Sequence, residues 1–378
     1  MPMNVTAEVV LQGAFGGSLD AVVDTLGNLP IWLGAFAGGA FGAAIGALPA
    51  FAFTGFLVIA GAAASVVGVP GGDSVGLVGI GFGHVFGPHV SFAGGAAAAA
   101  YAGKKGYIGA ENGYHNGKDI ASALGCRVDV LAVGGVFGLF GIAVEQLFRQ
   151  LLIPVDPIPL AICASAVVHR LAFGYDLVGT VHGGSILDMS PFERGERVGG
   201  APDDGEMVAD GGLVENGGVP KAEWLATEPW LGHMYKWHQV AAIGLVAGLA
   251  SGYVAFRTGN PFLGFGISAA SLLFLNLGVE KIPATHHMTL AGGTVFLALT
   301  ASGDSAMAGL SAGLALIAAG LFGVLAALIG ELGQRIFYAH GRTHFDPPAI
   351  SIVVWTVMLG FLHIVGIVPT GVWIPGTA

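Results

Sequence analysis

A seven-residue sequence, HVSFAGG at 89–95, returns at 287–293 as HMTLAGG, and each copy opens an apolar run. Other features surround both copies in the same order. Glycines spaced four apart precede each copy, an acid–base pair at i,i+4 follows it, and an Asp-Pro pair comes next. These features are Gly34, Gly38, Gly42, Gly46, Glu145, Arg149 and Asp156-Pro157 in the first half, and Gly244, Gly248, Gly252, Glu331, Arg335 and Asp346-Pro347 in the second. The chain therefore contains an internal duplication, which is typical of channels and transporters.

The duplicated chain is very apolar. Hydrophobic residues make up 54% of the 378 positions and charged residues only 10%, and the mean hydropathy is +0.76. A soluble protein of ordinary composition carries about 25% charged residues. Several stretches approach the roughly 20 apolar residues that span a bilayer. The sequence therefore predicts an all-α, multi-pass protein of the cell membrane, with the lipid bilayer as its surroundings.

Proline and glycine breakers divide each half into five apolar segments. The segments fall near 30–47, 50–68, 88–103, 128–150 and 157–178, and again near 238–256, 261–278, 286–302, 306–337 and 347–367. Because five is odd, the second copy enters the membrane from the opposite face. We therefore expect about ten membrane segments in two inverted repeats, 30–183 and 237–378.

The third segment of each half is unusually short. It follows a Pro or Gly cluster, and a Gly-Gly pair is expected to interrupt its first turns. Short, interrupted segments at matching positions point to a binding site near the bilayer midplane. Backbone freed by such a break must line a cavity or be buried in protein. We expect a pair of broken helices at this depth.

Two segments lie outside the repeats. In residues 1–29, Glu8, Gln12, Asp20 and Asp24 recur at multiples of four, which predicts an amphipathic segment at the membrane interface or against the bundle. In the second segment, 184–236, ten acidic and three basic residues fall between 188 and 228, in a chain of net charge −10. Its glycines and few large apolar residues predict a solvated acidic linker. Such an acidic, lysine-poor surface also fits a halophile-like protein, because salt screens the repulsion.

The basic residues predict an orientation. Under inversion, the 103–127 loop, the linker and the 335–345 loop share one side of the membrane. That side holds Lys104, Lys105, Lys118, Arg127, Arg335 and Arg342, whereas Arg149, Arg257 and Lys281 are expected on the other. The excess of bases predicts that the acidic linker is cytoplasmic.

The histidines of the repeated motif are the leading candidates for a binding site. His89 and His287 hold the same place in the two copies, where the amide ends of two broken helices would meet. Imidazole accepts a proton, hydrogen-bonds a polar solute or binds a transition metal. The expected solute-binding residues are His89, Ser91, Gly94, Gly95, His287, Thr289, Gly292 and Gly293. The alternative, that these histidines stabilise helix starts, stays open.

The acid–base and Asp-Pro pairs have simpler explanations. Glu145 with Arg149, and Glu331 with Arg335, lie on one helix face and neutralise each other at membrane depth. Both a structural ion pair and a gating or proton-transfer pair fit this spacing. The two Asp-Pro pairs are typical helix N-caps with Pro at the first helical position, and this explains them without a function.

Together these patterns predict a transport protein, a channel or a secondary carrier, for a small polar or ionic solute bound between the two motifs. No catalytic residue, no cofactor motif and no nucleic-acid-binding patch is expected. The glycine ladders predict close helix contacts, either within one chain or in a homo-oligomer. Two alternatives remain: a structural subunit of a membrane complex, and a membrane metalloenzyme. The metal-ligand candidates for the latter are His84, His89, His286 and His287.

Overall fold

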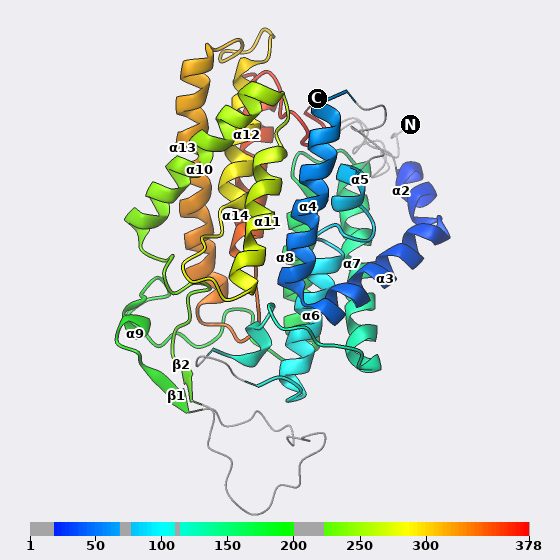
Figure 1. The fold of residues 1–378 in the computed structure, drawn as a ribbon, viewed down its shortest axis with the longest axis vertical. Coiled ribbons are helices and arrows are strands. Elements are labelled where there is room, and N and C mark those ends of the chain that lie inside the picture. Colours follow the sequence, from blue (N-terminus) through cyan, green and yellow to red (C-terminus); the bar gives the residue numbers. More distant parts are fainter. Residues whose placement is uncertain (1–18, 69–76, 110–113, 200–222, 378) are drawn as a thin grey trace, which may run out of the picture.

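The computed structural model describes residues 19–68, 77–109, 114–199 and 223–377 (Figure 1). This part of the chain is mostly helical, with 13 α-helices and one two-stranded sheet. Within it, five helices are long and apolar enough to cross a membrane, or six if the bent pair α2–α3 forms one span. The prediction of an all-α membrane protein is confirmed at this level.

The bundle combines long and short helices. The five long helices are α4 (Ala47–Val66), α7 (Val128–Gln150), α10 (Trp237–Thr258), α13 (Ala312–Gly333), which continues into the π-helical turn η2 (Gln334–Tyr338), and α14 (Pro347–Ile364). The shorter ones are α2 (Leu19–Leu26), α3 (Leu29–Ile45), α5 (Leu77–Gly81), α6 (Ser91–Lys104), α8 (Pro157–Ala172), α9 (Ser190–Glu193), α11 (Leu263–Asn276) and α12 (His286–Thr300), with the 3-10 turn η1 (Asn116–Lys118). Helices α6, α11 and α12 have 14 or 15 residues. They are shorter than the roughly 20 residues that a full crossing needs.

The helices form two groups with matching contacts (Figure 1). In the first group α3 packs on α6 and α7, and in the second α10 packs on α12 and α13. The groups meet where α4 packs on α11 and α8 on α14. We call the end of the molecule with the 114–127 and 339–346 loops the lower end, and the opposite end the upper end. Helix α3 runs toward the lower end, and α10 runs toward the upper end.

Glycines allow the closest helix contacts at corresponding places in the two groups. A Cβ atom on Gly94 would lie 2.7 Å from the Cα atom of Gly39, and one on Gly292 would lie 2.6 Å from the Cα atom of Gly248. Neither site has room for a side chain. Helices α6 and α12 run unbroken through their Gly-Gly pairs, so the predicted interruption there is wrong, because the glycines serve packing. At these positions the glycine ladders allow close helix contacts within one chain.

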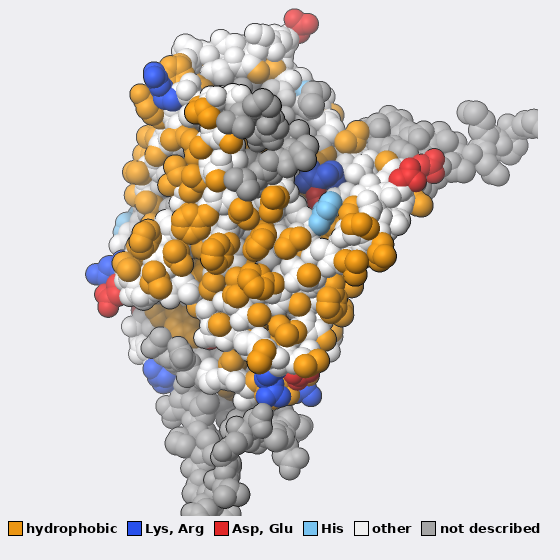
Figure 2. Space-filling view, turned by 45° about the vertical axis from the view of Figure 1, so that its right-hand side comes forward, with side chains coloured by type: hydrophobic (Ala, Val, Ile, Leu, Met, Phe, Trp, Pro, Cys, Tyr) orange, Lys and Arg blue, Asp and Glu red, His pale blue; other side chains and the backbone are white. Residues whose placement is uncertain are grey.

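The outer surface of the bundle suits lipid. Figure 2 shows hydrophobic side chains spread over the middle of the displayed face, with the charged side chains mainly toward its edges and ends. Leu33, Leu321 and Phe361 are each about 60% exposed. Exposed apolar area of this extent is costly in water and favourable in a bilayer.

The lower end carries the linker and corrects one prediction. Strands β1 (Arg197–Gly199) and β2 (Glu223–Leu225) pair antiparallel, a small exception to an all-α fold. Segments 1–18 and 200–222 lie outside the described residues, and with them Glu8, Gln12 and the middle of the linker; Asp20 and Asp24 lie on α2. Lys281 lines the same lower-end cavity as Lys118, so its expected place on the opposite side is wrong. The reason is that α11 ends at the lower end, and the chain then runs inward before α12 starts.

Candidate functional site: a central cavity

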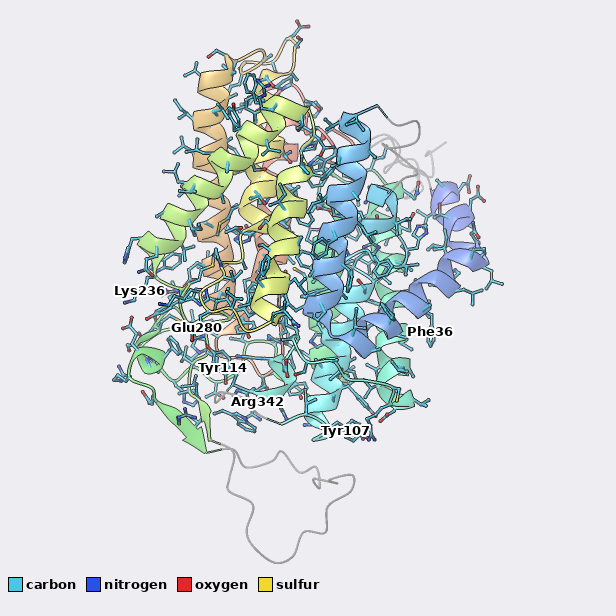
Figure 3. The ribbon with its side chains drawn as sticks, viewed as in Figure 1. Phe36, Tyr107, Tyr114, Lys236, Glu280 and Arg342 are labelled. Atoms are coloured by element: carbon cyan, nitrogen blue, oxygen red, sulfur yellow. The ribbon has the colours of Figure 1, made fainter. Side chains whose placement is uncertain are left out.

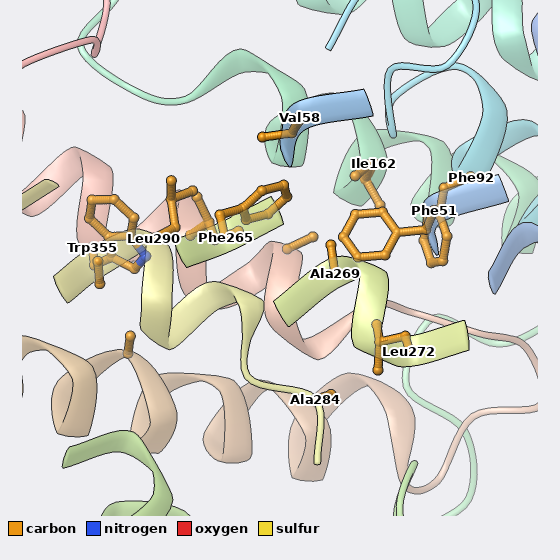
Figure 4. Close-up of a cluster of buried hydrophobic side chains, with 14 of the residues drawn as sticks. Phe51, Val58, Phe92, Ile162, Phe265, Ala269, Leu272, Ala284, Leu290 and Trp355 are labelled. Carbon is orange, nitrogen blue, oxygen red and sulfur yellow. The ribbon is translucent and has the colours of Figure 1, made fainter. Parts of the chain in front are cut away.

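A cavity of about 320 Å³ lies between the two helix groups. Residues of α4, α6, α7 and α8 line it from the first group, and residues of α11, α12 and α14 line it from the second. Figure 4 shows part of its apolar wall, where Phe51 and Phe92 of the first group lie near Phe265 of the second. The polar side chains that line it are His84, Glu145, Gln146, Arg149, Asp156, His286 and Asp346.

Two aspartates enter this cavity from corresponding helices. Asp156 caps α8 by accepting a hydrogen bond from the amide of Ile158 at 3.0 Å, and Asp346 caps α14 by accepting one from the amide of Ala349 at 2.8 Å. The predicted N-caps are confirmed. Sequence reasoning missed that both carboxylates also line one cavity. The cap role explained both residues locally, and the packing of α8 on α14 brings them to the same cavity.

Each acid–base pair is joined by a glutamine. Glu145 accepts hydrogen bonds from Nε of Arg149 and from Nε2 of Gln146, the latter at 2.7 Å. In the second group, Glu331 accepts hydrogen bonds from Nε of Arg335 and from Nε2 of Gln334, both at 2.6 Å.

The surroundings of the two arginines differ. The side chain of Arg149 is 41% exposed and lines the central cavity, whereas that of Arg335 is only 9% exposed. Arg335 also donates hydrogen bonds to the carbonyls of Leu187 and Tyr235. The first pair is therefore open to the cavity, and the second is enclosed by protein.

The motif histidines occupy three different places. His286 lines the central cavity, with its ring centroid 4.7 Å from that of Phe51. His287 lines a smaller cavity with Glu331. His89 is fully buried and packs against Gly141 of α7, outside the lining of the central cavity. The cavity therefore receives His286 and His84 rather than the pair His89 and His287.

The other motif residues make contacts within the scaffold. Ser91 donates a hydrogen bond to the carbonyl of Phe86 at 3.2 Å, and Thr289 donates one to the carbonyl of His286 at 3.0 Å. The glycines of both motifs contact neighbouring helices: Gly94, Gly95, Gly292 and Gly293. None of the six lines the central cavity.

The candidate metal ligands do not form a set. In the described ranges, no group of three or more His, Cys, Asp or Glu side chains is arranged to hold a metal ion. His286 and His287 are neighbours with ring centroids 5.7 Å apart, but His84 lies with the first of them at the central cavity and His89 lies elsewhere. The metalloenzyme alternative therefore lacks its ligand set in this part of the chain.

A comparison of the chain with protein-family models gives one match, over residues 21–377, to a family of unknown function, DUF7973. The chain belongs to DUF7973. No curated protein and no solved structure matches it. The DUF7973 match includes both helix groups and every residue of the central cavity.

This DUF7973 chain has a second large cavity, of about 650 Å³, at the lower end. Tyr114 and Glu280 line it, and both lie near this end in Figure 3. Leu48 and Trp230 line both this lower cavity and the central one. These two side chains therefore form a partition between the two cavities.

A buried ion pair joins the linker to the lower end. Glu228 is 1% exposed, and its carboxylate lies 2.8 Å from Nζ of Lys118 and accepts hydrogen bonds from the backbone amide and ring of His115. Burial by itself raises the pKa of Glu228, but Lys118 and His115 outweigh it and hold this pKa below its ordinary value. Glu228, in the C-terminal part of the linker, is therefore held as an anion against the 115–118 turn.

Proposed function

We propose that this protein is a membrane carrier that moves a small polar or ionic solute through the central cavity. The observation that carries the proposal is the position of this cavity at the contact between the two helix groups. Charged side chains of both groups line it within an apolar bundle. Ionisable groups inside a membrane are costly and usually have a function, and a solute site between related halves is typical of secondary transporters.

The proposal includes an inverted repeat of the two helix groups. The helix contacts of α3, α6 and α7 match those of α10, α12 and α13, and α3 and α10 run in opposite directions (Figure 1). Under this proposal the repeats are 30–183 and 237–378, with ten membrane segments. Two halves that tilt about a shared cavity expose it first to one side and then to the other.

The partition between the cavities favours a carrier over an open channel. A solute in the central cavity has to pass Leu48 and Trp230 to reach the lower cavity. Among the described Lys and Arg residues, Arg149 and Arg257 alone lie near the upper end of the helices. By the positive-inside rule, the lower end and the acidic linker are then cytoplasmic.

Solute flux into proteoliposomes tests the proposal. The panel comprises water, urea, ammonium and methylated amines, formate-sized anions, protons and alkali cations. We expect flux of one solute class, lowered about 100-fold in Asp156→Asn/Asp346→Asn, because two charged contacts of about tenfold each are lost. Asn also caps helices, so this variant keeps its fold. The control is Asp304→Asn on an exposed upper loop. Flux no higher than in empty vesicles for every solute would end the transport proposal.

A further inference from the structure

The central cavity has an aromatic wall. Seven of its lining residues are aromatic and come from both helix groups: Phe51, Phe82, Phe92, Trp230, Phe262, Phe265 and Trp373. Several pack together, with ring centroids of Phe82 and Phe262 5.4 Å apart and those of Phe82 and Phe265 5.5 Å apart. The faces of such rings attract cations, most strongly where water is excluded.

The charged side chains of the cavity also favour a cation. Three carboxylates line it against one guanidinium, and that guanidinium, of Arg149, is already bound by Glu145. The two carboxylates that the guanidinium does not neutralise are those of Asp156 and Asp346. Each lies at a helix N-terminus, which contributes roughly half a positive charge. The sum at these two sites is therefore still negative, which favours a cation and disfavours an anion.

One carboxylate oxygen is open to a ligand. Oδ1 of Asp156 accepts the hydrogen bond from Ile158, whereas Oδ2 makes no hydrogen bond to the described part of the chain. Both oxygens of Asp346 are already in contact with protein, Oδ2 with the amide of Ala349 and Oδ1 with Nε2 of His344 at 3.2 Å. Asp156 is therefore the better direct partner for a donor, and Asp346 adds charge.

His286 adds a polar ring to the lining of the cavity. It is 4% exposed and lines the cavity, and its Nδ1 atom has no hydrogen-bond partner in the described residues. Its ring lies against Phe51 and Phe265, with centroids 4.7 Å and 5.9 Å away. An imidazole ring donates or accepts a hydrogen bond according to its tautomer, so His286 can bind a hydrogen-bonding group of a solute in the cavity.

We propose that the solute is a small organic cation that carries a protonated or quaternary amine. Its ammonium lies between Asp156 and the aromatic wall, and its apolar part fills the rest of the cavity. The inference rests on the proposed transport function and names its substrate class. A volume of about 320 Å³ matches the cavities that hold small organic ligands and exceeds what a bare ion needs.

Binding to the full chain in lipid nanodiscs tests this directly, with the fluorescence of the cavity tryptophans as readout. The probes are choline and its uncharged carbon isostere, 3,3-dimethyl-1-butanol, which has the same shape. We expect choline to bind at least about tenfold tighter, since a desolvated cation–π contact and a carboxylate each contribute on this scale. Asp156→Asn and Phe265→Leu each weaken choline binding by about this factor, whereas Asp304→Asn leaves it unchanged.

The outcomes separate this inference from the proposed function. Equal affinity for choline and its isostere, or choline affinity unaffected by Asp156→Asn and Phe265→Leu, overturns the inference. Flux of anions or neutral solutes without choline binding overturns it too and leaves the transport function standing. Choline binding that depends on Asp156, in a protein without any flux, supports the site and overturns transport. Circular dichroism melting of each variant excludes unfolding as the cause of lost binding.

Discussion

Replacing Glu228 by Gln is expected to destabilise the protein by about 3–5 kcal/mol, because it leaves the buried ammonium of Lys118 without its counter-charge. Lys118 is 4% exposed, and its Nζ atom lies 4.4 Å above the ring of Tyr338, which replaces little of the lost attraction. The measurement is the free energy of unfolding in mixed detergent micelles, followed by circular dichroism. The same substitution frees the C-terminal part of the linker from the 115–118 turn.

The double variant Glu228→Gln/Lys118→Met is the control. Replacing a whole buried ion pair by uncharged groups is often neutral, so the double variant should regain most of the lost stability.

The pH dependence of stability gives a second check. The pKa of Glu228 in the folded protein is below its ordinary value of 4.5, so its stabilising effect is present above pH 4.5 and is lost as the pH falls through the lower value. If the free energy of unfolding of Glu228→Gln equalled that of the wild type, this account would be contradicted.

The arginines of the two acid–base pairs should differ strongly in their effect on stability. Arg335→Met is expected to cost about 3–5 kcal/mol, because it leaves Glu331 buried and unpaired and removes two donors from backbone carbonyls. Arg149→Met should cost less, about 1 kcal/mol, because the side chain of Arg149 is 41% exposed and, within the described residues, donates to Glu145 and to no backbone carbonyl.

Both arginine variants are compared by the same unfolding measurement, so each is the control of the other. The two arginines lie at the end of α7 and in the turn η2 that continues α13, helices that make matching contacts in the two groups, and the side chains replaced are identical. Equal losses of stability would show that exposure does not govern these pairs, and would contradict the structural difference between the two groups.

The helices could be predicted from sequence better than the cavity. Breakers such as Pro154 and Pro261 and the Asp-Pro caps are local signals, and they mark helix ends to within a few residues. The glycines at 94 and 292 were also visible in the sequence. Whether such a glycine interrupts its helix or allows close contact with another helix depends on what the neighbouring helix places opposite it. In the structure Gly39 lies opposite Gly94, and Gly248 lies opposite Gly292, so both glycines allow close contact.

The site residues depended on how the two groups dock. Asp156 and Asp346 had a complete local explanation as caps, and only the packing of α8 on α14 brings both to one cavity. His286 and His287 are adjacent in sequence, yet α12 turns one into the central cavity and the other into a smaller one. Sequence periodicity alone does not tell which of two neighbouring helix faces lines a cavity.

The central claim, that the cavity between the two helix groups is the solute route, is tested most directly by blocking it. Ile162 lines the cavity and becomes a single reactive site as Ile162→Cys, once Cys126 and Cys163 are replaced by Ser. A membrane-impermeant thiosulfonate is added to proteoliposomes that show flux, with Asp304→Cys on the upper loop as the labelled control. We expect labelled Ile162→Cys to lose most of its flux and labelled Asp304→Cys to keep it. Full labelling of Ile162→Cys with unchanged flux would contradict the account.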